Sequence, residues 1–376
     1  MGLLYDAVAL GMGAYTRTAL SVRTLRPEAF RPEPGTIVVS THRRETDVPL
    51  LCPSMYRAGR LWEKRGPRIS FAARHDLFRR GFFAGFPQGL HPRLRRALWS
   101  IDIGGYLPGV QVHPIRGASS VTLGEVFDTV PEAGLDELLP AAVAAPFRAR
   151  AARLGLPRPQ RGADVLRGEY ADLLWRSFTR EALDGPGLEK IWRRQGALAT
   201  EDFRGLVELV RGGAILVVFP EGKPSAHGEI GPLRPGLGAL MRRGRPRWIQ
   251  PVALAYDPLT RGRTRAYVSF LPAVAVPDED VEETVLDLLR LATPLTCGQV
   301  VARRLVQGGA SARELERELE RELDAARAEG RNVDPALAEG GTRRRRIADA
   351  LAAAGSHRAD LAYLAREHAS ARGQCL

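Results

Sequence analysis

Six short apolar runs, separated by helical segments, constrain the fold of this chain more than any other feature. The runs occupy residues 36–40, 69–73, 110–115, 214–219, 248–255 and 266–271, and segments such as 50–60 and 237–243 have a helical pattern. Runs of this length predict buried strands, and strands that alternate with helices indicate a largely parallel sheet. The chain is therefore predicted to be an α/β protein with a mostly parallel sheet flanked by helices.

Polar residues follow three of these runs. His42 comes after the first run, Arg116 after the third, and Glu221 after the fourth. Ligands of open α/β sheets bind outside the carboxyl ends of the strands. We therefore expect His42, Arg116 and Glu221 to lie at or near that edge of the sheet.

His42 and Asp47 have the chemistry of a base and its orienting partner. A neutral imidazole takes a proton from an alcohol near pH 7 when its other nitrogen is held in the right tautomer, and Asp47 is placed to hold it. Two simpler interpretations stay open on spacing alone. Asp47 precedes Val48 and Pro49, so it also fits a plain helix cap. A single histidine at a strand end is more often structural than catalytic.

The turn at residues 219–222, Phe-Pro-Glu-Gly, follows a strand-like run, so Glu221 is expected in a loop at a strand exit. Proline and glycine favour an ordinary turn at such a place, which is the alternative interpretation. His42 strengthens the functional interpretation of this turn, because both motifs occur where a parallel sheet presents its loops.

Taken together, these motifs resemble the glycerol-3-phosphate and lysophosphatidic acid acyltransferase superfamily. The hallmark of that superfamily is a His-x-x-x-x-Asp block followed downstream by Phe-Pro-Glu-Gly. Further blocks in the same order also resemble it, including one whose arginine, here Arg116, contacts the phosphate of the acceptor. The matching segments are residues 42–47, 69–78, 109–116, 219–222, 233–236 and 248–254.

The sequence departs from the pattern of the superfamily next to both motifs. Thr41 stands where an asparagine is usual, and Arg44 where a serine is usual. An arginine expected after Pro-Glu-Gly is missing, and Lys223 or Arg234 would supply that charge. Since these positions help to bind the acceptor, they affect its identity more than the reaction.

The resemblance implies acyl transfer from an acyl thioester to a hydroxyl of a glycerophosphate or lysophospholipid in phospholipid biosynthesis. His42 would deprotonate the acceptor, and Asp47 would stabilise the imidazolium that forms. No cofactor or metal is expected, and acyl-CoA or acyl carrier protein would be the co-substrate. The implied substrate-binding residues are Arg44, Arg116, Glu221, Gly222, Lys223 and Ser225. For Arg43 and Arg44 two interpretations stay open, contact with phosphate or a solvated side chain.

Three regions are expected along the chain. Residues 1–34 would form an N-terminal helix, residues 35–276 the acyltransferase domain, and residues 277–376 a helical C-terminal region. Proline-punctuated sequence suggests a helical insertion at about residues 117–200, in which residues 163–183 look helical.

Charge and cysteine content bear on location and partners. The chain of 376 residues has a net charge of +12, and nearly all its basic side chains are arginine. This excess suits anionic partners such as phosphorylated substrates or a membrane surface. Its three cysteines, Cys52, Cys297 and Cys375, suggest a reducing compartment. We expect a cytoplasmic protein associated peripherally with the inner face of the membrane.

The N-terminal segment has two interpretations of similar weight. It would lie in the membrane interface with Leu3, Leu4, Leu10 and Tyr15 on its buried side, or it would pack on the protein's own core.

Other functions remain open on sequence alone. A nucleic-acid-binding protein would account for the high pI and the basic run at residues 343–346, but not for the ordered blocks, so no nucleic-acid partner is expected. A non-catalytic lipid-binding relative, or an acyltransferase acting on another lipid or a glycolipid, would account for the altered positions near His42 and Glu221.

Overall fold

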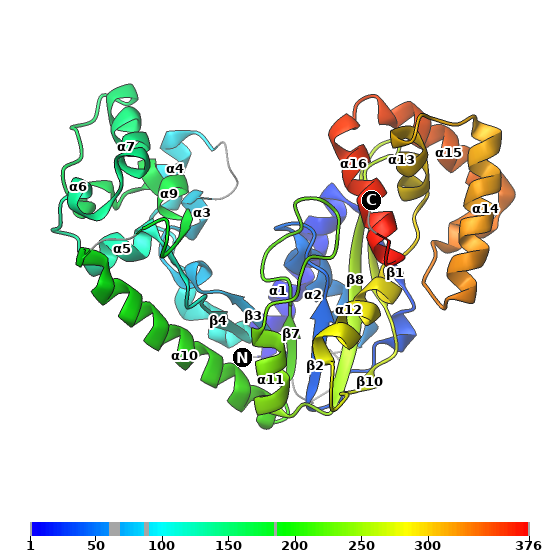
Figure 1. Cartoon of the computed structure of the whole chain (residues 1–376), viewed down its shortest axis with the longest axis horizontal. Helices are drawn as coiled ribbons and strands as arrows, with labels where there is room; N and C mark the ends of the chain where they lie inside the picture. The colour runs from blue at the N-terminus through cyan, green and yellow to red at the C-terminus, as the bar shows by residue number, and fades with distance from the viewer. Residues whose placement is uncertain (1, 60–67, 86–89, 184–185, 375–376) are drawn as a thin grey trace. The chain divides into compact units, whose positions relative to one another are not determined.

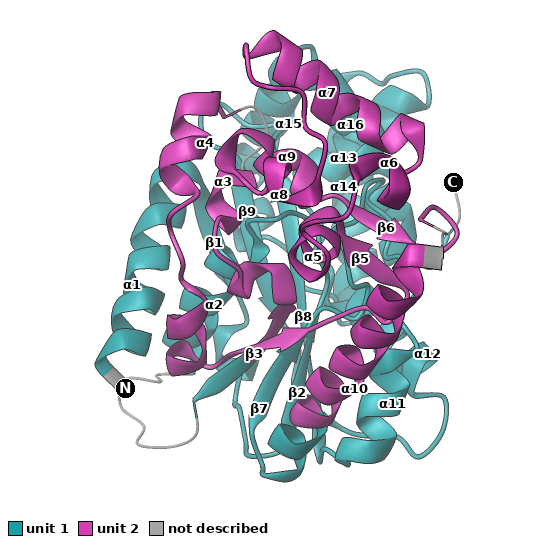
Figure 2. Ribbon diagram, turned by 90° about the vertical axis from the view of Figure 1, so that its left-hand side faces the viewer, with its two compact units in different colours: residues 1–70, 207–376 teal, residues 71–206 magenta. Residues whose placement is uncertain are grey.

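The structure is a computed structural model that describes residues 2–59, 68–85, 90–183 and 186–374 (Figure 1). The chain divides into two compact units, and each is described by itself. The first unit comprises residues 1–70 and 207–376, and the second comprises residues 71–206 (Figure 2).

The first unit is built on a mixed sheet in which most neighbouring strands are parallel. Its strand order is β1-β9-β8-β2-β7, and β10 also pairs with β8. β1 runs parallel to β9, and β2 runs parallel to both β7 and β8, whereas β9 and β10 are antiparallel to β8. The strands are β1 (Ser21–Leu25), β2 (Thr36–Ser40), β7 (Ile215–Val218), β8 (Trp248–Asp257), β9 (Arg265–Phe270) and β10 (Val274–Ala275).

The central strands are buried on both faces, which explains why their sequences are continuous apolar runs. Every residue of β2 and of β7 is buried. Two helices, α1 and α2, lie on one side of this sheet, and α11 and α12 lie on the other (Figures 1 and 2). Their bounds are α1 (Gly2–Ala19), α2 (Asp47–Ala58), α11 (Gly236–Gly244) and α12 (Val281–Ala292).

The C-terminal helices belong to the same compact unit as the sheet. They pack through their own apolar cluster, which includes Leu259, Val301, Leu319, Ile347 and Leu364. The helices are α13 (Cys297–Val306), α14 (Ala312–Ala328), α15 (Gly340–Ala354) and α16 (Arg358–Ala371), with short 3₁₀ helices η1 (Pro27–Ala29) and η6 (Pro335–Ala338) elsewhere in this unit. The region predicted as separate, residues 277–376, is therefore part of the sheet-bearing unit.

The second unit is mainly helical and has its own core around Phe127, Phe147 and Tyr170. β3 (Ile69–Arg74) enters it from the first unit and pairs in parallel with β4 (Val112–Ile115), while β5 (Ser120–Thr122) and β6 (Ser177–Thr179) form a small antiparallel pair.

The helices of the second unit are mostly short. They are α3 (Phe82–Gly85), α4 (Pro92–Leu98), α5 (Leu123–Thr129), α6 (Leu135–Leu138), α7 (Ala141–Arg153), α8 (Gly162–Val165), α9 (Ala171–Leu174) and α10 (Glu189–Arg211), with 3₁₀ helices η2 (His75–Phe78), η3 (Gly104–Val110), η4 (Gly168–Tyr170) and η5 (Pro186–Leu188). The long α10 extends past the expected end of the insertion and into residues of the first unit.

All six predicted strands are present, and three elements differ from the expected ones. Residues 163–183 form two short helices, a 3₁₀ turn and β6 instead of one helix. Gly168 interrupts this segment, and a Cβ atom there would lie 2.7 Å from the carbonyl oxygen of Arg95. Residues 21–25, expected in the N-terminal helical region, form β1. The helix expected over 50–60 is α2, which ends at Ala58, and Arg60 lies outside the described residues.

The N-terminal helix packs on the protein with one face and exposes the other. Tyr5 and Ala9 are buried, and the ring of Tyr5 lies 6.3 Å from that of Tyr56 in α2. On the opposite face four large apolar side chains are exposed, namely Leu3, Leu4, Leu10 and Tyr15. No helix in the described part of the chain has both the length and the apolarity needed to cross a membrane.

Candidate functional site

Two loops at the carboxyl ends of β2 and β7 form the candidate site. We call residues 41–46 the histidine loop and residues 219–231 the glutamate loop. Because β2 and β7 are parallel neighbours, the two loops leave the sheet at the same edge. They are bonded directly: the amide N–H of His42 donates to Glu221 Oε1 at 2.8 Å, and that of Ser225 donates to the carbonyl of His42, also at 2.8 Å.

His42 and Asp47 form a hydrogen-bonded pair. Nδ1 of His42 lies 2.8 Å from Oδ2 of Asp47, whose side chain is fully buried, whereas the His42 side chain is 16% exposed. The imidazole also packs on Phe219, with the two ring centroids 4.5 Å apart. With Nδ1 donating to Asp47, Nε2 becomes the ring nitrogen that accepts a proton.

Asp47 is held by three further donors. Its Oδ2 accepts from the backbone N–H groups of Arg43 and Arg44 at 2.5 and 3.0 Å, and its Oδ1 accepts from the hydroxyl of Tyr256 at 2.7 Å. These backbone donors precede α2, so Asp47 does not act as the plain helix cap that remained open on sequence alone. A carboxylate with this many donors is fixed in position.

Tyr256 was not identified from the sequence. It lies near the end of β8, which runs parallel to β2, so its position at the carboxyl edge was the signal available. Burial, together with the charge of Asp47, raises the pKa of the Tyr256 hydroxyl. The phenol therefore remains a proton donor to Asp47. Its ring also supports the guanidinium of Arg44, which lies 4.5 Å from the ring centroid.

Glu221 is buried near the start of the glutamate loop, and its carboxylate contacts both His42 and Gly231 at the end of that loop. While Oε1 accepts from His42, Oε2 accepts from the N–H of Gly231 at 3.0 Å. Gly222 adopts a positive φ of 73°, and a Cβ there would lie 3.1 Å from the side chain of Arg234. Arg234 itself lies against the turn, since its Nε is 3.4 Å from the carbonyl oxygen of Glu221.

The remaining predicted residues of the glutamate loop have different surroundings. Ser225 makes a local turn, in which its hydroxyl donates to the carbonyl of Glu229 at 2.7 Å and accepts from the N–H of Gly228 at 3.0 Å. Lys223 is exposed. Of the two residues expected to supply the missing positive charge, Arg234 is therefore the one in contact with the Glu221 turn.

Arg116 belongs to the second unit, where it follows β4. Its Nη1 lies 3.2 Å from Oδ1 of Asp202, so in this structure the guanidinium is paired within its own unit. Burial raises the pKa of the Asp202 carboxyl, while Arg116 acts in the opposite direction.

The basic run at residues 343–346 contacts acidic side chains of the same unit. Arg343 pairs with Glu320, Arg344 lies 3.5 Å from Glu316, and Arg346 lies 3.5 Å from Asp334. Most of the run therefore pairs with side chains of α14 and with Asp334.

The cysteines of the described chain are free thiols. Cys52 and Cys297 are both buried, and Cys375 lies outside the described residues. Burial raises the pKa of Cys52 to about 12, so this thiol stays protonated near neutral pH.

Comparison with known proteins gives little support of its own. No family model matches the chain, and no curated protein sequence matches it. Among solved structures it is similar to the 1-acyl-sn-glycerophosphate (LPA) acyltransferase PlsC from Thermotoga maritima, with 11% identity, a TM-score of 0.40 and coverage of 76% of each chain.

Proposed function

We propose that the protein transfers a fatty acyl group from an acyl thioester to a hydroxyl of a glycerophosphate or lysophospholipid. The observation that carries this proposal is the His42–Asp47 pair, in which a partly exposed imidazole donates to a buried carboxylate held by three other donors. The motif resemblance supplies the substrate class, and acyl-CoA or acyl carrier protein is the proposed donor.

In the proposed reaction, Nε2 of His42 takes the proton of the acceptor hydroxyl as its oxygen attacks the thioester carbonyl carbon. The new C–O bond forms, the C–S bond breaks, and the departing sulfur takes the proton from the imidazolium. Asp47 stabilises the positive imidazolium through Nδ1. No covalent acyl-enzyme is required, because the acceptor oxygen itself is the nucleophile.

The other predicted residues are proposed to bind the acceptor. Glu221 and Gly222 shape the floor of the site beside His42, and Ser225 and Lys223 follow in the same loop. Arg44 and Arg116 are proposed to bind phosphate through their planar guanidinium groups. For Arg116 this means that a phosphate would replace the Asp202 carboxylate as the partner of the guanidinium.

The first test is a purified-protein assay with radiolabelled acyl-CoA or acyl carrier protein and a panel of acceptors. The panel contains glycerol 3-phosphate, lysophosphatidic acid, other lysophospholipids and a glycolipid. We expect transfer to at least one phosphorylated acceptor. Lipid binding without transfer to any acceptor would contradict the proposal and support a non-catalytic lipid-binding protein.

The second test is His42→Ala, which we expect to lower kcat at least a hundred-fold, since general-base catalysis contributes about 10²–10⁴-fold. A matched control is His357→Ala. His357 also pairs with an aspartate, its Nδ1 lying 3.0 Å from Asp360, but it lies between α15 and α16. Transfer by His42→Ala near the wild-type rate would rule out the mechanism.

A further inference from the structure

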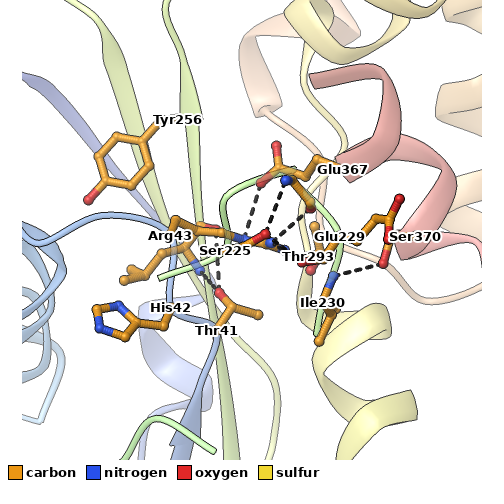
Figure 3. Close-up of polar contacts among 12 residues, drawn as sticks. Thr41, His42, Arg43, Ser225, Glu229, Ile230, Tyr256, Thr293, Glu367 and Ser370 are labelled. Atoms are coloured by element: carbon orange, nitrogen blue, oxygen red, sulfur yellow. Dashed lines mark hydrogen bonds and ion pairs between the residues drawn. The ribbon is translucent and has the colours of Figure 1, made fainter. Parts of the chain in front are cut away.

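The two loops of the candidate site are both bonded to α16, about 325 residues further along the chain than His42. Figure 3 shows the His42 ring on one side of the histidine loop, and Glu367 and Ser370 of α16 on the other. The first contact runs through Arg43 to Glu367, and the second through Ile230 to Ser370.

Arg43 connects three parts of the unit. Its backbone N–H donates to Asp47, while its side chain, which is fully buried, points away from the His42 ring. Nη1 donates to the carbonyl oxygens of Gly228 and Glu229 at 2.8 and 3.2 Å, and Nε lies 3.3 Å from Oε1 of Glu367. A residue next to the base thus ties the histidine loop to the glutamate loop and to α16.

Glu367 is itself held from a second helix. Its Oε2 accepts from Nε2 of Gln299 at 2.8 Å, and Gln299 is fixed by the capping box at the start of α13, where its Oε1 accepts from the N–H of Thr296 at 2.9 Å. Burial acts to lower the pKa of Arg43, but Glu367 and the other acidic groups nearby outweigh it and raise the pKa. The guanidinium therefore stays charged in this buried place.

The glutamate loop packs closely against α16 at two points. The N–H of Ile230 donates to the hydroxyl of Ser370 at 3.0 Å. Gly228 has a positive φ of 90°, and a Cβ there would lie only 2.1 Å from the carbonyl oxygen of Tyr363. Only glycine fits this contact, so the loop backbone lies directly on the helix.

We propose that α16 acts as a clamp on the reacting loops, with Arg43 and Glu367 as positioning residues for His42, Asp47 and Glu221. This inference rests on the proposed acyl transfer. Its physical basis is that a catalytic base must be held in a productive geometry, because small displacements of the base lower the reaction rate. The helical C-terminal region thereby becomes part of the catalytic apparatus without touching substrate.

Glu367→Gln and Arg43→Gln test the clamp, because each removes one charge and keeps a polar side chain. In assays below the unfolding temperature of each variant, we expect kcat to fall about ten- to a hundred-fold, while the KM for the acyl donor changes less than about two-fold. The matched control is Arg346→Gln, since Arg346 is also buried beside a carboxylate, 3.5 Å from Asp334, but contacts neither loop. It should lose stability and keep the wild-type kcat.

Amide hydrogen exchange gives a readout that does not depend on turnover. In the Glu367→Gln variant we expect faster exchange at Ser225 and Ile230, whose N–H groups bond to His42 and Ser370, and unchanged exchange there in Arg346→Gln.

The outcomes separate the clamp from the proposed function. If the wild type transfers acyl groups but Glu367→Gln keeps its kcat, the clamp is overturned and the function stands. If the wild type transfers none, the proposed function fails, and unaltered exchange at Ser225 and Ile230 in Glu367→Gln would overturn the clamp as well. Faster exchange supports the clamp only where the wild type also transfers acyl groups.

Discussion

Asp47 is the residue that orients the His42 imidazole in the candidate site. Its two oxygens accept from one imidazole, two backbone amides and one phenol. The amides and the phenol fix the carboxylate, and the carboxylate in turn fixes the tautomer of His42. In the proposed reaction, Asp47 would hold the imidazole and compensate its positive charge.

Asp47→Asn should lower kcat by about 10³–10⁴-fold, because the amide favours the wrong histidine tautomer, as in other histidine–aspartate sites. Tyr256→Phe removes only one donor to Asp47 and should lower kcat about ten-fold or less. Steady-state kinetics of both variants would check this order. A Tyr256→Phe variant slower than Asp47→Asn would contradict the role given to the carboxylate.

The two neighbouring arginines of the histidine loop have side chains in different environments. Arg43 is buried against α16, whereas Arg44 is half-buried with its guanidinium over Tyr256. On sequence alone both were interpreted as phosphate-binding or solvated residues. For Arg43 that interpretation is wrong, because its side chain is buried and its Nε lies 3.3 Å from Oε1 of Glu367.

A glutamate of helix α14 makes ionic contacts with the neighbouring helices. Glu322 lies among basic side chains of its neighbours: Arg303 of α13 at 2.9 Å, Arg372 after α16 at 2.8 Å, and the imidazole of His368 of α16 at 3.3 Å, whose own pKa is lowered by burial. Burial alone would raise the pKa of Glu322, but His368 and Arg303 lower it to about 2. The ionised carboxylate therefore stabilises the packing of three helices.

The lowered pKa of Glu322 gives a pH dependence with a definite sign. The folded-state pKa lies below the ordinary value of 4.5, so its stabilisation is present above about pH 4.5 and is lost as pH falls toward 2. Glu322→Gln should reduce the free energy of unfolding by about 2 kcal/mol at pH 7 and by much less at pH 3.

Denaturant unfolding at both pH values checks this prediction. The control is Glu320→Gln on the same helix, whose side chain is 49% exposed and pairs with Arg343. It should change stability by less than about 1 kcal/mol at either pH. An equal loss for Glu322→Gln at pH 7 and pH 3 would contradict the assigned ionisation.

At the scale of the whole molecule, the outer face of α1 is an apolar surface with no covering element in the described first unit. Leu3 is 87% exposed and Tyr15 is 60% exposed, while the opposite face packs on α2. We propose that this face lies in the interface of an anionic membrane, where a lipid substrate would be met.

Replacing Leu3, Leu4, Leu10 and Tyr15 together by serine should lower binding to phosphatidylglycerol vesicles at least ten-fold, because each buried apolar side chain contributes about 1 kcal/mol or more. Co-sedimentation measures the binding. Thermal unfolding should change little, since these side chains are exposed. Val306→Ser, which alters an exposed apolar residue of α13, is the control and should bind as the wild type does. Undiminished binding by the quadruple variant would exclude this face.

Local pattern determined much of the fold. Apolar runs of the right length became β2, β3, β4, β7, β8 and β9. β2 and β7 are buried along their whole length, which requires continuous apolar sequence, whereas β4 is only partly buried. The short β1 was not recognised, because Ser21, Arg23 and Thr24 give it no apolar run and it is a strand only through pairing with β9. Such a strand depends on a partner that local sequence does not reveal.

The sequence predicted the pairing of His42 with Asp47 and the nearness of Glu221 from two strand exits and a motif resemblance, although spacing alone left a helix cap and a structural histidine open, and the observed contacts confirm both predictions. Only the tertiary structure decided what holds them. Tyr256, Glu367 and Ser370 come from distant elements, and their contacts with the two loops depend on how β8 and α16 pack. Contacts across hundreds of residues leave no periodic signal in the chain, since packing, rather than local propensity, brings them together.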